Sequence, residues 1–362
     1  MTPPEVSNGV YRYIFNHLPF VDQKEFQFCF LTKNAEGLAD TPEYRKYRFP
    51  IVKLNSVQRN GAKSFEKEIK RILKDGYDVI HLHSSVWRGF LIEEVAMKMG
   101  VRKVIVHSHS TGIDFDSNDE REMILKEHLY YKPLFSLDYA TDLCACSKEA
   151  ADWMFCERIP RNRIRFMPNA IDVVKYRFDM SIRMKCREEL GIDDRIVLGH
   201  IGRYSYTKNQ EFLVRCFSKA IKHNPRLCLV MMGQGENIYR VKRLVDDLGL
   251  NDSVICFGWK DNTVDYLNAM DVFMLPSRFE GLPISIVEAQ TSGLKSVVSD
   301  VVTDEVMITN LVSKLPLESD AWINEMVNSK VDKLRASREK EVTNAGFDIR
   351  ESSRKLMELY CS

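Results

Sequence analysis

The sequence has almost no net charge, because 52 lysine and arginine residues stand against 51 aspartate and glutamate residues among 362 in all. A net charge of +1 produces no general field that would attract nucleic acid, so an anionic ligand must be bound by a local group of side chains. The chain also lacks a signal peptide and any apolar run near the ~18 residues that cross a bilayer. We therefore expect a soluble, cytoplasmic protein.

The nine cysteines include no CxxC pair. The closest two, Cys144 and Cys146, alternate in an apolar run typical of a strand, and Cys228 and Cys256 also lie in apolar runs. An odd number of scattered thiols in such surroundings is typical of reduced, buried cysteines rather than of disulfides or zinc ligands.

Short apolar, β-branched runs alternate with amphipathic segments from end to end. The predicted strands are 78–83, 103–109, 139–147, 196–202, 227–233, 253–258, 271–277 and 295–300. A helix is predicted over 64–76, where Phe65, Ile69 and Leu73 share one face. Strands that alternate with helices predict an α/β protein with parallel, doubly wound sheets.

The alternation breaks once, between "PNAID" (168–172) and "DDRIVLGHIG" (193–202), where a charged segment with one short helix intervenes. A chain of this length favours two domains of ordinary size. The predicted organisation is an N-terminal Rossmann-like domain, a linker, a C-terminal Rossmann-like domain and a final amphipathic helix, over residues 1–175, 176–192, 193–341 and 342–362. A cleft between the two domains is the expected ligand site.

The stretch "SRFEGLPISIVEAQ" (277–290) places two carboxylates, Glu280 and Glu288, around a Gly-Leu-Pro turn. Pro283 suits the first position of a helix, where its missing donor has no consequence. The free amides at this helix start would then face a phosphate or a sugar hydroxyl. The two carboxylates are separated by roughly 7 Å or more along the helix axis, which suits two parts of one long ligand.

Upstream, "GHIGRYSYTKNQEF" (199–212) places Arg203 and Lys208 in a loop between a strand and a helix that starts near Asn209. Two cations beside a glycine and a helix start match a diphosphate, and each charge-assisted hydrogen bond contributes ~1.5 to 3 kcal/mol. The carboxylates would accept from hydroxyls on either side of that diphosphate. A nucleotide sugar has this pattern of polarity.

Other functions fit parts of the same pattern. A hydrolase would place paired carboxylates ~5 to 9.5 Å apart, but it has no use for Arg203 and Lys208. "GQGE" (233–236) lacks the third glycine and the later acidic residue of a dinucleotide site, so Gly233 is expected in a tight strand-to-helix turn beside the nucleotide. A nucleotide-sugar epimerase and a truncated, non-catalytic nucleotide-sugar-binding module stay open as alternatives.

In the first half, "VIVHSHSTG" ends a strand on which His107 and His109 point the same way. Either histidine could reach the cleft, or be simply a hydrogen-bonded residue at a strand end. The nearby "DFD" (114–116) matches a DxD metal-binding motif, but with Asp119 and Glu120 following we interpret it as a solvated acidic loop.

The segments "PNAID", "GRYSYTKNQEFL", "MMGQGE", "FGW" and "AMDVFMLPSRFEGLPISIVEAQTSGL" closely resemble the retaining glycosyltransferases of family 4, which have the GT-B fold, and especially their bacterial exopolysaccharide type. The resemblance covers nearly the whole chain, and its most specific part is the Glu280-x7-Glu288 element. It implies two Rossmann-like domains facing across a cleft. It also implies transfer of a hexose from a nucleotide sugar, a UDP-sugar above all, to a lipid-linked or growing glycan, with no metal or other cofactor.

The resemblance assigns a role to each matching residue. Glu280 would contact the donor sugar and Glu288 the ribose, while Arg203 and Lys208 would bind the diphosphate. His109, rather than His107, would lie near the reacting sugar. The implied catalytic residues are thus His109, Arg203, Lys208 and Glu280, and the further donor-binding residues are Gly9, Gly233, Gly281, Leu282, Ile284 and Glu288.

The chain departs from the family pattern near its start. "SNGVYRYIF" (7–15) looks like the family's glycine loop, where the backbone at Gly9 would approach the donor phosphates. Relatives have a strand before this loop, so we expect the first strand of the N-terminal domain to be missing here. A smaller departure is Lys295, where relatives usually carry proline.

Two further partners are expected. By the resemblance, the acceptor would be a glycan or a polyprenyl-diphosphate-linked sugar, and the last helix would pack back on the first domain. "PEYRKYRF" (42–49) and the lysine face of 64–76 mix basic residues with tyrosines, which suits peripheral contact with anionic lipid at the inner membrane surface. Ordinary solvated surface is the alternative.

Overall fold

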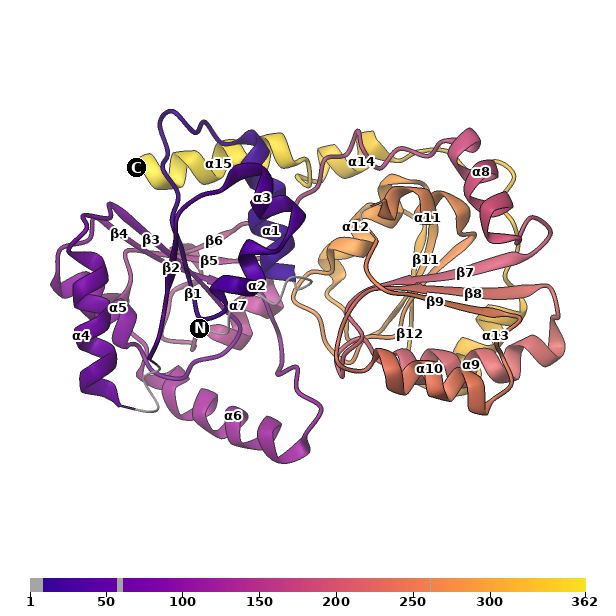
Figure 1. Cartoon of the computed structure of the whole chain (residues 1–362), viewed down its shortest axis with the longest axis horizontal. Helices are drawn as coiled ribbons and strands as arrows, with labels where there is room; N and C mark the ends of the chain where they lie inside the picture. The colour runs from indigo at the N-terminus through magenta and orange to yellow at the C-terminus, as the bar shows by residue number, and fades with distance from the viewer. Residues whose placement is uncertain (1–8, 57–60, 261) are drawn as a thin grey trace. The chain divides into compact units, whose positions relative to one another are not determined.

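The computed structural model describes residues 9–56, 61–260 and 262–362. The chain forms two compact units, coloured from indigo to magenta and from pink to orange in Figure 1, with the yellow C-terminal helix added to the first. The first unit comprises Met1–Ile113, Ser117–Asn169 and Ile349–Ser362, and the second comprises Asp114–Asp116 and Ala170–Asp348.

The first unit is built on short parallel strands. Its strands are β1 (Phe30–Thr32), β2 (Ile51–Lys53), β3 (Val79–Ser84), β4 (Lys103–Ser108), β5 (Asp142–Ala145) and β6 (Ile164–Phe166). Strands β3, β4, β5 and β6 pair in parallel in that order, and β1 pairs with β2. Because β4 lies between two neighbours, its side chains are buried along its whole length.

Helices cover these strands, and the last of them comes from the far end of the chain. They are α1 (Gly9–His17), α2 (Ala35–Ala39), α3 (Pro42–Tyr47), α4 (Ala62–Leu73), α5 (Leu91–Lys98), α6 (Asn118–Tyr131), α7 (Lys148–Met154) and α15 (Ile349–Cys361). Leu356 and Leu359 of α15 pack in one apolar cluster with Ile105 of β4 and Cys144 of β5. The C-terminal helix is therefore part of the first unit.

The second unit has a six-stranded parallel sheet. Its strands are β7 (Ile196–Ile201), β8 (Leu227–Met232), β9 (Val254–Phe257), β10 (Val272–Leu275), β11 (Lys295–Ser299) and β12 (Val312–Leu315). Their order across the sheet is β9, β8, β7, β10, β11, β12, so the direction of winding reverses between β7 and β10. This is the strand order of a doubly wound, Rossmann-like domain, in which ligands bind at the carboxyl ends of the strands where the order reverses.

Helices lie on both faces of this sheet. They are α8 (Met180–Leu190), α9 (Gln210–His223), α10 (Ile238–Asp247), α11 (Thr263–Ala269), α12 (Ile284–Thr291), α13 (Ser319–Val327) and α14 (Glu339–Asn344). Figure 1 shows α9, α10 and α13 on one face and α8, α11 and α12 on the other. This two-sided cover explains why the strands are apolar throughout instead of alternating.

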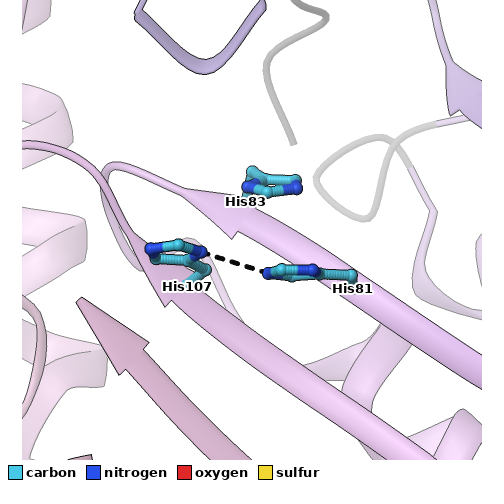
Figure 2. A group of neighbouring side chains, drawn as sticks. All are labelled: His81, His83 and His107. Atoms are coloured by element: carbon cyan, nitrogen blue, oxygen red, sulfur yellow. Dashed lines mark hydrogen bonds between the residues drawn. The ribbon is translucent and has the colours of Figure 1, made fainter. Parts of the chain in front are cut away.

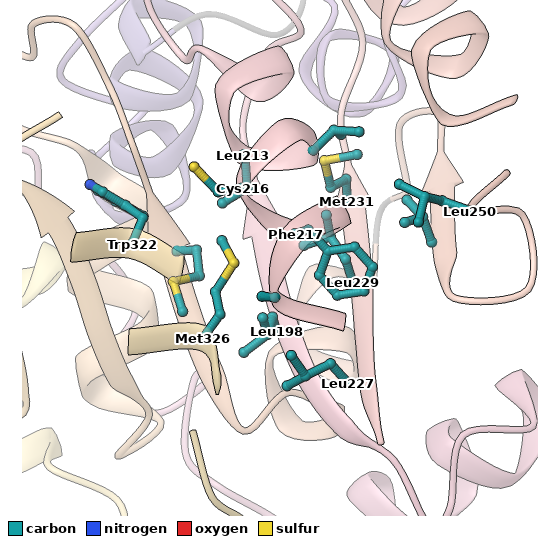
Figure 3. Close-up of a cluster of buried hydrophobic side chains, with 14 of the residues drawn as sticks. Leu198, Leu213, Cys216, Phe217, Leu227, Leu229, Met231, Leu250, Trp322 and Met326 are labelled. Atoms are coloured by element: carbon teal, nitrogen blue, oxygen red, sulfur yellow. The ribbon is translucent and has the colours of Figure 1, made fainter. Parts of the chain in front are cut away.

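The core under α9 and α13 is drawn in Figure 3. Leu198 of β7 and Leu229 of β8 meet Phe217 of α9, and Trp322 and Met326 of α13 close the same cluster. All five side chains are fully buried. Burying side chains of this size contributes roughly 1.5–3 kcal/mol each, so this cluster holds α9 and the loop before it firmly on the sheet.

Each of the eight predicted strands corresponds to a strand of the structure, shorter by a few residues at most of their ends. The predicted helix over 64–76 is α4, which starts two residues earlier and ends at Leu73. Four further strands, β1, β2, β6 and β12, were not predicted. Each of these strands has only three or four residues, and some of their side chains are partly exposed. Their apolar pattern is therefore too short to detect.

The predicted linker over 176–192 is wrong, because this segment lies inside the second unit. It contains α8, whose Arg183 and Arg187 are buried and paired with Asp271 at the start of β10. The charged residues suggested a solvated connection. They are instead a buried ion-pair group that docks the helix. The second unit also continues to Asp348, beyond the predicted end at residue 341.

The start of the chain also differs from the prediction. Gly9 is the first residue of helix α1, which buries Tyr11, Tyr13 and Phe15, and so does not lie in a loop. The residues before Gly9 fall outside the described part of the chain, so the missing first strand stays a prediction. Within the described ranges, no helix combines the length and the apolar character needed to cross a membrane.

Candidate functional site

The loops that follow β7 and β10 lie next to each other, because these two parallel strands are neighbours in the sheet. The loop after β7 spans 202–209 and the loop after β10 spans 276–283. The backbone amide of Arg278 donates to the carbonyl of Thr207 at 2.8 Å, which ties one loop to the other. The predicted donor residues of the second unit therefore meet where a doubly wound domain binds its ligands.

Lys208 and Glu280 form an ion pair across these two loops. The same carboxylate oxygen, Oε1 of Glu280, also accepts from the hydroxyl of Ser277 at 2.6 Å. Both charged side chains are largely buried, with relative exposures of 18% for Lys208 and 10% for Glu280. Lys208, a predicted phosphate ligand, is thus bound directly to Glu280, the predicted ligand of the donor sugar.

Arg203, the other predicted phosphate ligand, pairs with Asp114. The second oxygen of Asp114, Oδ1, accepts from the backbone amide of Thr207 at 2.9 Å. Burial lowers the pKa of Arg203 below the usual value of a guanidinium. A carboxylate thus holds both the guanidinium and a loop amide, which are groups that would bind a phosphate equally well.

The interpretation of "DFD" as a solvated acidic loop is therefore wrong. Besides the contacts of Asp114, Asp116 accepts from the side-chain amide of Asn237 at 2.8 Å and from Arg240 at 3.3 Å. The motif alone could not show this, because its cationic partners lie about 90 and 120 residues away along the chain.

A buried histidine, His200, positions the loop after β7 through hydrogen bonds. Nδ1 of His200 donates to the carbonyl of Met274 at 2.8 Å, so Nε2 is left to accept from the side-chain amide of Gln210 at 3.1 Å. That amide also donates to the carbonyl of Arg203 at 2.7 Å. Burial lowers the pKa of His200 to about 4, so the ring is neutral at pH 7 and fixes the backbone of Arg203.

The turn after β8 lies against the same loop. Gly233 has φ +155°, and a Cβ at this position would lie 2.0 Å from the carbonyl oxygen of Gly202. At Gly235 a Cβ would similarly meet the carbonyl oxygen of Tyr204 at 2.2 Å. Only glycine allows this approach of the two loops, which agrees with the tight strand-to-helix turn expected here.

The starts of two helices supply free amides at these loops. Helix α12 begins at Ile284 with Pro283 as its N-cap, one position earlier than expected for this proline, and no side chain caps it. Helix α9 begins at Gln210 after Asn209, which has a left-handed backbone (φ 58°). Uncapped helix starts favour bound anions because their amides and the helix dipole both point there.

Two hydroxyls of the loop after β7 are buried without a hydrogen-bond partner among the described residues. In the part of the chain that the structure describes, neither the Ser205 hydroxyl nor the Thr207 hydroxyl has a hydrogen-bond partner. A buried polar group in a native protein normally has one. Both hydroxyls lie between Arg203 and Lys208 in the sequence, so a ligand bound there could supply it.

In the first unit, His107 and His109 do point the same way, with ring centroids 4.1 Å apart. They contact a second pair of histidines that the sequence analysis missed: His107 is hydrogen-bonded to His81 at 3.2 Å, and His109 to His83 at 2.8 Å. Burial lowers the pKa of all four rings. The signal was available, because "HLH" (81–83) lies near the end of β3 and "HSH" (107–109) runs over the end of β4.

The two segments proposed to contact lipid lie on α3 and α4. On α4, Lys70 pairs with Glu66 at 2.6 Å, which lowers the net positive charge of that face. Nothing in the structure tests contact with a membrane, which stays a prediction.

Two family models match the chain. The model described as "Glycosyltransferase Family 4" matches residues 7–175, and the one described as "Glycosyl transferases group 1" matches residues 183–342. The chain belongs to the family 4 glycosyltransferases.

Similar proteins agree with this assignment. This family 4 glycosyltransferase is 26% identical to the putative glycosyltransferase EpsF of Bacillus subtilis, over 97% of this chain and 93% of that protein. It is 25% identical to the UDP-Gal:alpha-D-GlcNAc-diphosphoundecaprenol alpha-1,3-galactosyltransferase of Escherichia coli, over 98% and 93%. HepE of Anabaena, crystallised with UDP, has the same fold, with a TM-score of 0.71, 17% identity and coverage of 99% and 98%. The fold is GT-B.

The predicted site residues of this glycosyltransferase are divided between its two units. Gly9 and His109 belong to the first unit. The second unit holds Arg203, Lys208, Gly233, Glu280, Gly281, Leu282, Ile284 and Glu288. Of these, Glu288 lies on α12 and is buried, as are Leu282 and Ile284. Their individual roles toward a donor stay predictions.

Proposed function

We propose that this glycosyltransferase transfers a hexose from a UDP-sugar to a lipid-linked or growing glycan, with retention of the anomeric configuration and without a metal ion. One observation carries the proposal. Arg203, Lys208 and Glu280 meet at the carboxyl ends of β7 and β10, beside two helix starts. Cations and amides there suit a diphosphate, and the carboxylate next to them suits a sugar hydroxyl.

The relatives support the choice of substrates. The name of the Escherichia coli protein states a UDP-galactose donor and a diphosphoundecaprenol-linked acceptor. HepE was crystallised with UDP and also with UDP-glucose. A capsular polysaccharide glycosyltransferase of Staphylococcus aureus, 25% identical over 82% of this chain, supports a role in surface polysaccharide synthesis.

In this mechanism the protein stabilises the departing diphosphate. Arg203 and Lys208 offset the negative charge that develops on it, which is the role that a metal ion has in other transferases. Glu280 accepts from a hydroxyl of the donor sugar, and Glu288 from the ribose. The acceptor hydroxyl attacks from the face that the diphosphate leaves, and the leaving phosphate takes its proton. His109 orients the sugar.

The proposal is tested by incubating the full chain with UDP-, GDP- and ADP-hexoses, with and without a polyprenyl-diphosphate-linked acceptor, in EDTA. We expect release of UDP and a new glycosidic bond only when a UDP-hexose and the acceptor are both present. NMR of the product should show the donor's anomeric configuration. A new UDP-hexose formed without acceptor would instead identify an epimerase, free hexose a hydrolase, and nucleotide binding without product a non-catalytic module.

The pairing of Arg203 with Asp114 makes a prediction about donor affinity. Because Asp114 occupies the guanidinium and the Thr207 amide, a diphosphate has to displace its negative charge. Asp114→Asn keeps the size of the side chain and removes the charge. Since a hydrogen bond to a charged group is worth ~1.5–3 kcal/mol, we expect the Kd for UDP to fall about tenfold. Isothermal titration calorimetry measures it.

Asp116→Asn is the matched control, because Asp116 accepts from Asn237 and Arg240, whereas Asp114 accepts from Arg203 and the Thr207 amide. Its Kd for UDP should equal that of the wild type. Unchanged or weaker UDP binding by Asp114→Asn would show that Asp114 orients Arg203 and does not compete with the diphosphate.

A further inference from the structure

The first unit contains a partly buried cluster of histidines that the proposed transfer reaction does not explain. Of the eight histidines in the chain, His17, His81, His83, His107 and His109 lie around the ring of Tyr13 or against one another. The parallel register of β3 and β4 pairs His83 with His107 and places His81 two residues earlier on the same face. The cluster therefore follows from the sheet itself and not from a mobile loop.

Three of these rings bring nitrogen atoms close together. His81, His83 and His107 each offer one ligand atom within 4.8 Å of the other two. Figure 2 shows the rings of His81 and His107 joined edge to edge by a hydrogen bond of 3.2 Å, with the ring of His83 above them. Zinc with Zn–N bonds of about 2.0–2.1 Å and tetrahedral angles needs nitrogens roughly 3.3 Å apart. Nε2 of His81 and Nδ1 of His107 already meet this distance.

The outer nitrogens of two rings are held in place by other groups. Nδ1 of His81 lies 2.8 Å from the hydroxyl of Tyr360, and Nδ1 of His83 lies 2.8 Å from Nε2 of His109. Such outer contacts are what metal-binding histidines usually have, because they fix the ring and its tautomer. They leave Nε2 of His81 and Nε2 of His83 as the ligand atoms.

The protein's own groups do not satisfy the cluster. If the Tyr360 hydroxyl donates to Nδ1 of His81, then Nε2 of His81 donates to Nδ1 of His107, and the N–H on Nε2 of His107 has no acceptor. If instead Nδ1 of His107 donates to His81 and His81 donates to Tyr360, the lone pair on Nε2 of His107 has no donor. His107 is fully buried, and no described residue is a hydrogen-bond partner of its Nε2. A metal ion on Nδ1 of His107 would settle which of these two arrangements holds, because it would fix the proton of that ring on Nε2.

The chemistry of the group selects the ligand. The three rings are neutral at pH 7, because burial and the neighbouring histidines lower the pKa of each. Neutral imidazoles bind borderline divalent ions such as Zn²⁺, whereas Mg²⁺ and Ca²⁺ prefer oxygen ligands. An ion would replace the proton shared by His81 and His107. The ring of His83, now stacked on His81 at 4.2 Å, would turn toward it.

We propose that His81, His83 and His107 form a binding site for one divalent transition-metal ion of the Zn²⁺ type, with an open fourth position. The ion takes no part in the transfer chemistry. It would, however, bind the ring that is hydrogen-bonded to His109, the residue predicted to orient the donor sugar. On the proposed function, a bound ion therefore slows transfer.

Metal binding is measured on the full chain after treatment with EDTA and gel filtration. Titration with Co²⁺ should give the visible absorption bands of a tetrahedral ion, saturating at one equivalent, and Zn²⁺ should displace them. Zn²⁺ should also raise the melting temperature, because it binds the native state. These readouts do not depend on glycosyl transfer, so they separate this site from the proposed function.

Variants assign the ion to the cluster. His83→Gln and His107→Gln each remove a ligand, so they should weaken binding by more than the ~10–100-fold typical for loss of an outer contact. Tyr360→Phe should weaken it within that range, since Tyr360 only positions His81. His223→Gln is the matched control, because His223 is exposed at the end of α9. Circular dichroism checks the fold, and His83→Gln serves alone if the buried His107 variant is unfolded.

Two results would overturn the proposal. One is the absence of both cobalt bands and calorimetric heat with the wild type. The other is binding that His83→Gln leaves unchanged, which would assign the ion to free thiols such as Cys29 or Cys361.

Discussion

Arg203→Ala should lower turnover at least ~100-fold while leaving the second unit folded, because removing one preorganised donor from a developing anion typically has this effect. The guanidinium lies at the carboxyl end of β7, and its backbone is fixed from below by Gln210 and His200. Arg203 is not among the described apolar residues that form the core beneath α9 and α13. The loss should therefore appear in kcat, in assays of UDP release and product formation, while circular dichroism shows that the second unit is still folded.

Arg240→Ala is the matched control. Arg240 pairs with Asp116 in the same acidic segment, but its side chain is 57% exposed. Turnover should stay near that of the wild type, since an exposed ion pair contributes about 0–1 kcal/mol. Combining Arg203→Ala with Asp114→Asn should recover UDP binding, because the uncompensated carboxylate is gone, but not turnover. Near-normal turnover by Arg203→Ala would refute the role of this residue.

The sequence predicted which side chains would gather in the second unit, because parallel strands place their carboxyl ends at one edge of the sheet. Arg203 and Lys208 follow β7, and Glu280 follows β10, so a correct list of strands was enough to bring them together. The partners of these groups could not be predicted in the same way. Asp114 is about 90 residues from Arg203, and no local pattern marks a carboxylate that reaches a distant cation.

Charged segments were the hardest part of the chain to interpret. Polar composition alone suggested a solvated linker before β7 and a solvated loop at 114–116. Charged side chains of both segments instead form ion pairs within the second unit. A hydrophobic pattern identifies the apolar core well, but it does not say whether a charge is in water or beside a counter-ion. The same limit explains why His81 and His83 were missed as a cluster, although their strand was found.

The buried ion pairs of α8 lead to the prediction with the largest effect on stability. Asp271, at the start of β10, accepts from Arg183 at 2.5 Å, from Arg187 at 3.2 Å and from the backbone amide of Val197 at 2.8 Å. Its side chain is only 2% exposed. The neighbouring Arg335 is partly buried, and desolvation together with the charge of Arg183 lowers its pKa to about 9. One carboxylate thus compensates several guanidiniums away from water.

Asp271→Asn keeps the shape of the side chain and removes its charge. Breaking a buried ion pair by removing one partner destabilises a protein by roughly 3–5 kcal/mol, because the remaining charge stays buried without compensation. In a unit of this size, 1 kcal/mol corresponds to about 2–4 °C, so the melting temperature of the second unit should fall by roughly 10 °C. Differential scanning calorimetry and urea unfolding measure the loss.

Asp304→Asn is the matched control, since Asp304 also pairs with a cation, Lys314 at 2.6 Å, but is 87% exposed. It should leave the melting temperature unchanged, because solvent and salt screen such pairs.

Asp271 lies at the amino end of β10, opposite the end that carries Glu280. The UDP affinity of Asp271→Asn, measured well below its unfolding transition, should therefore match that of the wild type. A melting temperature close to that of the wild type would contradict the argument that α8 is docked by charge. We expect stability to depend on the amino end of β10 and donor binding on its carboxyl end. Weakened UDP binding by folded Asp271→Asn would instead show that the two ends are coupled.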